Sequence, residues 1–225
     1  MPLFGMVGIL MKAVVLEQFA RIGTALSNPS RLSLLDLLCQ SEKTVETLVE
    51  QSKLPLKNVS AQLKVLKEAG LVKSRKEGKY VRYSVSDERV ALFWSSLQAF
   101  GTSQMTELRQ IAAAIALDPD SATAVDRREL MARAKRDEIV VIDVRPKDEF
   151  EAAHLPYAIS VPLAEIKGHL KKLPKSKKIV AYCRGPYCLF AKEAVALLKR
   201  RGFKAVHLRD GVQEWKTAGQ AVVAG

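Results

Sequence analysis

The sequence predicts two domains, a mainly α domain followed by an α/β domain with a parallel sheet. The chain has 225 residues, enough for two cores of about 100 residues each. Up to about residue 117 the apolar residues recur with helical spacing, interrupted by one β-rich segment. After that, buried-type strands at 138–145 and 178–183 alternate with helical segments, which is the pattern of a parallel sheet.

Five helices and one hairpin are predicted in the first half. Asn28 and Pro29 are suited to the N-cap and first turn of the second helix, and Gly70 closes the fourth. The segment 72–86 is rich in β-formers around Gly78 and predicts a hairpin. The predicted helices are 16–26, 28–39, 43–51, 54–71 and 88–116.

A polar segment separates the two halves. The predicted domains are residues 1–112 and 125–225, joined by a linker at 113–124. In the second half, the helix 189–203 follows the strand 178–183 and leads to a further strand at 205–208. These elements complete the expected alternation of strands and helices.

Charge and cysteine content limit the function classes. The formal net charge of +12 indicates a polyanionic partner or an acidic surface. Three cysteines are too few for a disulfide framework, so a reducing cytoplasm is expected. The apolar start of the chain lacks the preceding charge of a signal peptide and the length of a membrane span. It is interpreted as an arm or lead-in to the first helix, and no membrane partner is expected.

The predicted helix over 56–68 has two unlike faces. Leu56, Val59, Leu63 and Leu66 form an apolar stripe, and small residues alternate with lysines opposite. Between residues 53 and 82 nine Lys and Arg stand against two Glu, a net charge of +7. A solvated basic face is the alternative, but charge, helix pair and hairpin in this order favour double-stranded DNA. The predicted DNA-binding residues are Lys57, Asn58, Ser60, Ala61, Lys64, Lys76, Lys79 and Arg82.

The segments "ALSNPSRLSLLDLL", "VSAQLKVLKEAGLV" and "KEGKYVRYSV" resemble the second helix, recognition helix and wing of ArsR-type winged helix-turn-helix regulators. The resemblance implies a homodimer that binds a DNA operator, as a repressor. Metal-sensing members often carry a Cys-x-Cys pair where this chain has Thr44 and Glu46, or Asp and His where it has Asp87 and Arg89. Sulfide-responsive members carry a cysteine pair, but only Cys39 stands here, interpreted as a buried inert thiol. No metal site is expected.

The stretch "AYCRGPYCLF" carries two cysteines in a strand–turn–helix setting. Amide groups of the turn and of the helix start would converge on Cys183, which is expected to lower its thiol pKa and to hold a sulfur-centred anion. Pro186 has no N–H, so Gly185 and Tyr187 are the predicted loop donors. Arg184 is predicted to attract an anionic sulfur donor.

The cysteine pair has four alternative interpretations. Cysteine phosphatases need an arginine where Leu189 stands. A zinc site needs two further ligands, and His154, His169 and His207 follow no ligand spacing. A structural disulfide is disfavoured in the cytoplasm. Two inert buried thiols remain an open alternative.

The second half resembles a single rhodanese domain through "IVVIDVRPKDEFEAAHLPYAISVP", "YCRGPYC" and "LRDGVQEW". The resemblance implies that Cys183 is a nucleophile that takes sulfane sulfur from thiosulfate or a persulfide, without a cofactor. Ala153, Tyr157 and Asp210 stand where the family usually has glycine. The charged residues Asp143, Arg145 and Glu149 could be catalytic groups, but a buried ion-pair frame under the loop is favoured, and Trp215 is interpreted as core.

Cys188 ends the loop and could act as a resolving thiol, attacking a Cys183 persulfide. The resulting disulfide would persist after the donor is gone, which suits a sensor. The sequence therefore predicts a DNA-binding regulator whose second domain senses or carries sulfane sulfur. The alternatives are a sulfurtransferase enzyme with an accessory DNA-binding domain, and an inert rhodanese fold that binds another protein.

Overall fold

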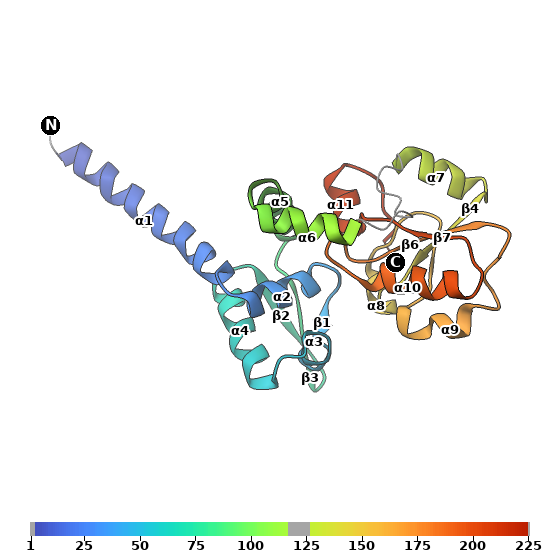
Figure 1. The fold of residues 1–225 in the computed structure, drawn as a ribbon. Helices are drawn as coiled ribbons and strands as arrows, with labels where there is room; N and C mark the ends of the chain where they lie inside the picture. The colour runs from blue at the N-terminus through green and yellow to red at the C-terminus, as the bar shows by residue number, and fades with distance from the viewer. Residues whose placement is uncertain (1–2, 117–126, 225) are drawn as a thin grey trace. The chain divides into compact units, whose positions relative to one another are not determined.

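The structure is a computed structural model that describes residues 3–116 and 127–224 (Figure 1). The chain divides into two compact units, Met1–Ala91 and Leu92–Gly225. Residues 117–124 of the predicted linker lie outside the described residues, so the predicted domain limits stay predictions. Within the described ranges, no helix is both long and apolar enough to cross a membrane.

The first unit packs the helices α2, α3 and α4 against a small antiparallel sheet of order β1-β3-β2, and α1 contacts α2. Asn28 caps the second helix by accepting a 3.2 Å hydrogen bond from the amide of Arg31, and Gly70 follows the fourth helix at φ 74°, so both predicted helix ends are confirmed. The elements are α1 (Leu3–Leu26), α2 (Pro29–Leu38), β1 (Lys43–Thr44), α3 (Val45–Ser52), α4 (Leu56–Glu68), β2 (Val72–Glu77) and β3 (Tyr80–Val85).

Two predictions for this part of the chain are wrong. Leu56 was placed on the apolar stripe of α4, but it is 58% exposed because it is the first residue of the helix, before the buried turns begin. The single helix predicted over 88–116 is two helices, α5 (Glu88–Gln104) and α6 (Thr106–Ala116). The chain turns at Met105, and the side chain of Leu108 packs 3.2 Å from where a Cβ on Gly101 would lie. Glycine at 101 thus allows α6 to approach α5.

In the second unit, four parallel strands form a sheet of order β5-β4-β6-β7. Successive strand residues point to opposite faces, and both faces are covered (Figure 1). Ile142 contributes to the core beneath α9 and α10, whereas Val141 contributes to the core with α7 and α11, where Trp215 is 1% exposed. The predicted two-part fold class and the core position of Trp215 are confirmed. The elements are α7 (Arg127–Lys135), β4 (Ile139–Asp143), α8 (Lys147–Ala152), β5 (Ala158–Ser160), a 3-10 turn (Leu163–Glu165), α9 (Ile166–His169), β6 (Lys178–Tyr182), α10 (Phe190–Arg200), β7 (Ala205–His207) and α11 (Val212–Thr217).

Candidate functional site

The cysteine loop, residues 183–188, begins where β6 ends at Tyr182. The amide of Cys188 donates to the carbonyl of Gly185 at 3.1 Å, which closes the turn, and Gly185 has a φ of 136° that L side chains rarely adopt. The helix α10 then begins at Phe190. The loop therefore lies at the carboxyl edge of the parallel sheet, where side chains that follow the strands gather.

The two cysteines of the loop contact each other. The Cys183 thiol is 2% exposed and lies 3.3 Å from the carbonyl oxygen of Cys188, to which it can donate. Interaction between the two side chains raises the pKa of Cys183 and lowers the pKa of Cys188. Cys188 is only partly buried. The loop thus brings together one enclosed sulfur atom and one accessible sulfur atom.

The pKa shifts differ from the expectation that Cys183 carries the acidic thiol. Burial, followed by the hydrogen bond to Cys188, raises the pKa of Cys183 well above its usual value. The hydrogen bond from Cys183, together with the amides of Arg184 and Phe190, lowers the pKa of Cys188 to about 7. The two pKa shifts therefore have opposite directions, and the thiol with the lowered pKa belongs to the less buried cysteine.

Amide donors lie around both sulfur atoms. The amide groups of Gly185 and Ala191 donate to Cys183 and partly offset the effect of burial on its pKa. The donor roles of Gly185 and Tyr187 in binding a sulfur anion stay predictions, and Ala191 was not among the predicted donors. The first turn of α10 supplies this donor, because the first amides of a helix have no partner within the helix.

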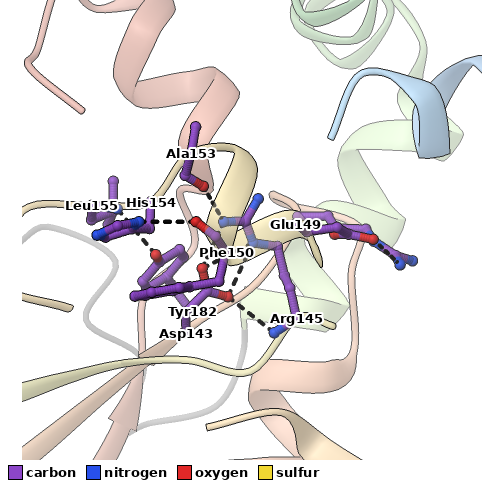
Figure 2. Close-up of polar contacts among 9 residues, drawn as sticks. Asp143, Arg145, Glu149, Phe150, Ala153, His154, Leu155 and Tyr182 are labelled. Carbon is purple, nitrogen blue, oxygen red and sulfur yellow. Dashed lines mark hydrogen bonds and ion pairs between the residues drawn. The ribbon is translucent and has the colours of Figure 1, made fainter. Parts of the chain in front are cut away.

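Two buried ion pairs lie beneath the cysteine loop (Figure 2). Arg145 donates to both carboxylate oxygens of Asp143, with a shortest distance of 2.6 Å, and to the carbonyl of Ala153 at 2.7 Å. Glu149 accepts three hydrogen bonds from Arg184, at 2.6, 2.9 and 3.2 Å. Asp143, Arg145 and Glu149 are all 0% exposed, which confirms the predicted ion-pair frame. Because Arg184 is engaged with Glu149, its attraction of an anionic donor stays a prediction.

The segment before α11 supports the loop from a second side. A Cβ on Gly211 would lie 2.6 Å from the carbonyl oxygen of Cys183, so only glycine fits without a shift. The carboxylate of Glu214 accepts the Gly211 amide at 2.8 Å and lies against Gly185. Glu214 was not predicted, although its position three residues after Gly211 is that of a helix-capping acid. Asp210, in place of the usual glycine, pairs with Arg127 at 2.6 Å.

The predicted DNA-binding residues form an exposed surface on α4 and the β2–β3 hairpin, with two exceptions. Asn58 is partly buried and accepts a hydrogen bond from Gln62. Arg82 pairs with Glu77 and lies 3.9 Å from Glu42. Glu42 also binds Arg75 through two hydrogen bonds, and its role was missed because it lies outside the basic segment. Lys57, Ser60, Ala61, Lys64, Lys76 and Lys79 are exposed.

Two other titratable side chains, Cys39 and His154, have a structural role. Cys39 is 6% exposed, and burial, followed by the charge of Asp36, raises its pKa, which confirms a buried thiol. The Nδ1 atom of His154 lies 2.9 Å from the carbonyl oxygen of Phe150, and the two rings stack. The described residues contain no group of three or more His, Cys, Asp or Glu side chains that could hold a metal ion.

Comparisons with known proteins agree with this arrangement. Residues 28–74 match the bacterial regulatory protein, arsR family, and residues 126–218 match the rhodanese-like domain. The "HTH-type transcriptional regulator Rv0324" of Mycobacterium tuberculosis is 39% identical over 95% of this chain and 94% of its own length. This chain belongs to the ArsR family. It is an ArsR-family transcriptional regulator with a C-terminal rhodanese-like domain.

The two parts of this ArsR-family regulator also match separate proteins. The "Thiosulfate sulfurtransferase GlpE" of Coxiella burnetii is 33% identical over 36% of this chain and 76% of that protein. A solution structure from Mycobacterium bovis, described as a homodimeric winged helix-turn-helix DNA-binding domain, is 38% identical. It covers 43% of this chain and 89% of that structure, with a TM-score of 0.41. The helices α5 and α6 lie between the two family matches, at 28–74 and 126–218, and are part of neither.

Proposed function

We propose that this regulator is a repressor that binds its operator as a homodimer and senses sulfane sulfur through a persulfide on Cys183. The observation that carries the proposal is a pair of cysteines in one short loop, with the buried Cys183 thiol 3.3 Å from the carbonyl oxygen of Cys188. Two thiols in one loop, with amide donors around them, can accept sulfur and then record its arrival. The proposal places the protein in the cytoplasm, where thiols stay reduced.

Sulfur acceptance uses Cys183 as the nucleophile. As Cys183 attacks, its proton passes to the leaving group of the donor, so Cys188 keeps its thiolate form for the next step. Its Sγ attacks the outer sulfur of thiosulfate or of a thiol persulfide. The donor S–S bond breaks, and its electron pair leaves with sulfite or with the thiolate of the donor. The loop then holds a Cys183 persulfide, whose charge the Gly185 and Ala191 amides stabilise.

Cys188 can then resolve the persulfide. Its thiolate attacks the Sγ of Cys183, a Cys183–Cys188 disulfide forms, and the outer sulfur leaves as sulfide. The two cysteines are oxidised by two electrons, and the sulfane sulfur is reduced to sulfide. The disulfide outlasts the donor until a cellular thiol reduces it, so it stores the signal.

Surfaces of the first unit support the DNA-binding and dimer parts of the proposal. The lysines of α4 and of the hairpin are exposed and suited to phosphates. The helix α1 exposes Met11, Val14, Val15 and Phe19, each more than half accessible. An apolar stripe of this kind on a helix suits a second copy of the chain.

The proposal is tested with wild type and Cys183→Ser, before and after treatment with thiosulfate or glutathione persulfide. Operator affinity is measured by fluorescence anisotropy on a duplex selected from a random pool by the reduced full-length protein. We expect the donor to change the affinity of wild type and to leave that of Cys183→Ser unchanged. Equal responses, or mass spectra in which Cys183 never carries sulfur, would contradict the proposal.

A sulfurtransferase enzyme is the second candidate, favoured by the likeness of the rhodanese-like domain to a protein named thiosulfate sulfurtransferase. Turnover with thiosulfate and cyanide separates the two. Sustained turnover supports the enzyme. A single round of sulfur loading, followed by a Cys183–Cys188 disulfide, supports the sensor.

A further inference from the structure

The helix α5 contacts the cysteine loop directly. The side chain of Tyr187, which immediately precedes Cys188, hydrogen-bonds through its hydroxyl to the hydroxyl of Thr102 on α5. The Thr102 hydroxyl in turn donates to the carbonyl of Gln98 at 2.7 Å. Because that bond uses the single hydroxyl hydrogen of Thr102, Tyr187 is the donor in the first bond. The loop is thus joined to the backbone of α5 by two successive hydrogen bonds.

A second contact joins α5 to the support of the loop. The hydroxyls of Thr217 on α11 and Ser95 on α5 lie 3.3 Å apart, and Ser95 is 8% exposed. The same helix α11 carries Glu214, which holds Gly211 against the backbone of Cys183. A displacement of the cysteine backbone would therefore reach α5 by two routes.

The space between these contacts allows the loop to move. A cavity of about 440 Å³ lies between α5 and the loop, lined in part by Gln98, Ala99 and Thr102 of α5 and by Pro186, Asp210 and Glu214. Side chains in a close-packed interior have little room to rearrange, whereas a cavity leaves room for a second position of Pro186 and Tyr187.

We propose that α5 reads the sulfur state of the cysteine loop through the Tyr187–Thr102 hydrogen bond. This inference rests on the proposed function and adds the route of its regulation. Formation of the Cys183–Cys188 disulfide replaces a contact between two thiols by a covalent bond about 2 Å long. Tyr187 lies within the closed ring, next to Cys188, so its hydroxyl shifts relative to Thr102. The helix α5 begins three residues after the end of β3, the second strand of the basic hairpin, so a change in α5 is passed along the chain toward the DNA-binding surface.

The test uses two full-length variants that each remove one hydroxyl, Tyr187→Phe and Thr102→Val. Their matched controls are Tyr157→Phe, an exposed tyrosine outside the loop, and Ser96→Ala, an exposed hydroxyl of α5 bonded to Leu92. Each protein is treated with glutathione persulfide. Sulfur loading is measured by mass spectrometry, affinity for the selected duplex by anisotropy, and backbone exchange of residues 92–104 by hydrogen–deuterium exchange.

We expect sulfur loading to change the DNA affinity of wild type and of both controls by about tenfold, a size typical of coupled sites. Tyr187→Phe and Thr102→Val should load sulfur as wild type does, with a change in affinity below about threefold. Loading should alter exchange over 92–104 in wild type and not in these two variants.

Two outcomes would overturn the inference, and a third leaves the decision to hydrogen–deuterium exchange. If both variants load and respond like wild type, the hydrogen bond does not transmit the signal, and the proposed function still stands. If neither variant loads sulfur, the contact serves the chemistry instead. If wild type loads sulfur without a change in DNA affinity, the proposed function fails, and exchange over 92–104 then decides the inference: an unchanged α5 overturns it, and a change lost in the variants supports it.

Discussion

The wing hairpin and the cysteine loop use the same devices in opposite surroundings. Each turns at a glycine of positive φ, Gly78 at 58° and Gly185 at 136°. Nothing lies within 4 Å of a Cβ built on Gly78, whereas one built on Gly185 would meet the Glu214 carboxylate at 2.9 Å. Each turn also has an arginine–glutamate pair beside it. The side chains of Arg75 and Glu42 are 56% and 30% exposed, whereas those of Arg184 and Glu149 are 14% and 0% exposed.

Because they differ in burial, the exposed Arg75–Glu42 pair and the buried Arg184–Glu149 pair have different roles. In water the attraction of two opposite charges is screened, so the exposed pair adds little stability and mainly sets the charge that the wing presents. Inside the second unit, a charge left without its partner keeps the full penalty of lost hydration. The buried pairs therefore fix the position of the cysteine loop, and the exposed pairs adjust a charged surface.

The largest effect is expected from the buried frame. Arg145→Met removes the partner of Asp143 and leaves a carboxylate that is 0% exposed. We expect the free energy of unfolding to fall by about 3–5 kcal/mol, the size found when one partner of a buried pair is removed. Urea unfolding in a Trp94→Phe background, in which Trp215 reports by fluorescence, measures it. The double variant Asp143→Leu/Arg145→Met should regain most of the loss, and a loss below about 1 kcal/mol in the single variant would break the comparison.

The tight packing of the loop backbone gives the next effect. Gly211→Ala places a methyl group 2.6 Å from the carbonyl of Cys183, so the loop must shift. We expect a loss of about 1–3 kcal/mol in the free energy of unfolding, as for overpacked cores, and slower sulfur loading of Cys183. Gly168→Ala, where nothing lies within 4 Å, is the matched control and should leave both unchanged. If Gly211→Ala and Gly168→Ala had the same stability and the same rate of sulfur loading, the backbone of the cysteine loop would be as loosely packed as that of the wing tip.

The thiol pair predicts a pH dependence. Because the pKa of Cys188 is lowered to about 7, its alkylation by iodoacetamide should rise as the pH increases through 7 and be lost below it. Cys183→Ala removes the hydrogen bond that is the largest cause, so the midpoint should move to higher pH and the rate at pH 7 should fall by up to about tenfold. Mass spectrometry of Cys188 labelling measures it, with buried Cys39 as the unlabelled reference. If wild type and Cys183→Ala had the same midpoint of alkylation, Cys183 would not be the cause of the lowered Cys188 pKa.

The sequence was most informative where local chemistry decides the structure. Asn28 and Pro29 predict a helix start, and the order of strand, turn and helix predicts the place of Cys183, because each depends on a few neighbouring residues. The break at Met105 was not predicted. It depends on Leu108 packing against Gly101, a contact that local helical spacing does not reveal.

The missed parts of the site depend on contacts between distant segments. The positions of Glu42 beside Arg75 and of Glu149 beside Arg184 follow from the fold and not from sequence distance, which is 33 and 35 residues. The expectation that Cys183 carries the lowered thiol pKa differs from the structure for the same reason. The burial of Cys183, which reverses the expected direction of its pKa shift, is set by the packing of β6 and α10 around it.

The smallest structural effect, and the sharpest test of the wing, is expected from Glu42→Gln. The change removes the Glu42 charge beside Arg75 and Arg82, which both keep their contact with Glu77, and leaves the hairpin backbone intact. We expect little change in stability, a several-fold rise in affinity for the selected duplex at low salt, and a salt dependence steeper by about one phosphate contact. Glu165→Gln, an exposed carboxylate of the second unit, makes the same change in net charge. If both variants gain equally in anisotropy titrations across salt concentrations, overall charge and not the Glu42–Arg75 pair sets the affinity, and the exposed pair has no local role. A gain confined to Glu42→Gln would show that Glu42 neutralises positive charge of the wing that can otherwise bind DNA. The buried arginines Arg145 and Arg184 differ, because their charge is paired within the second unit.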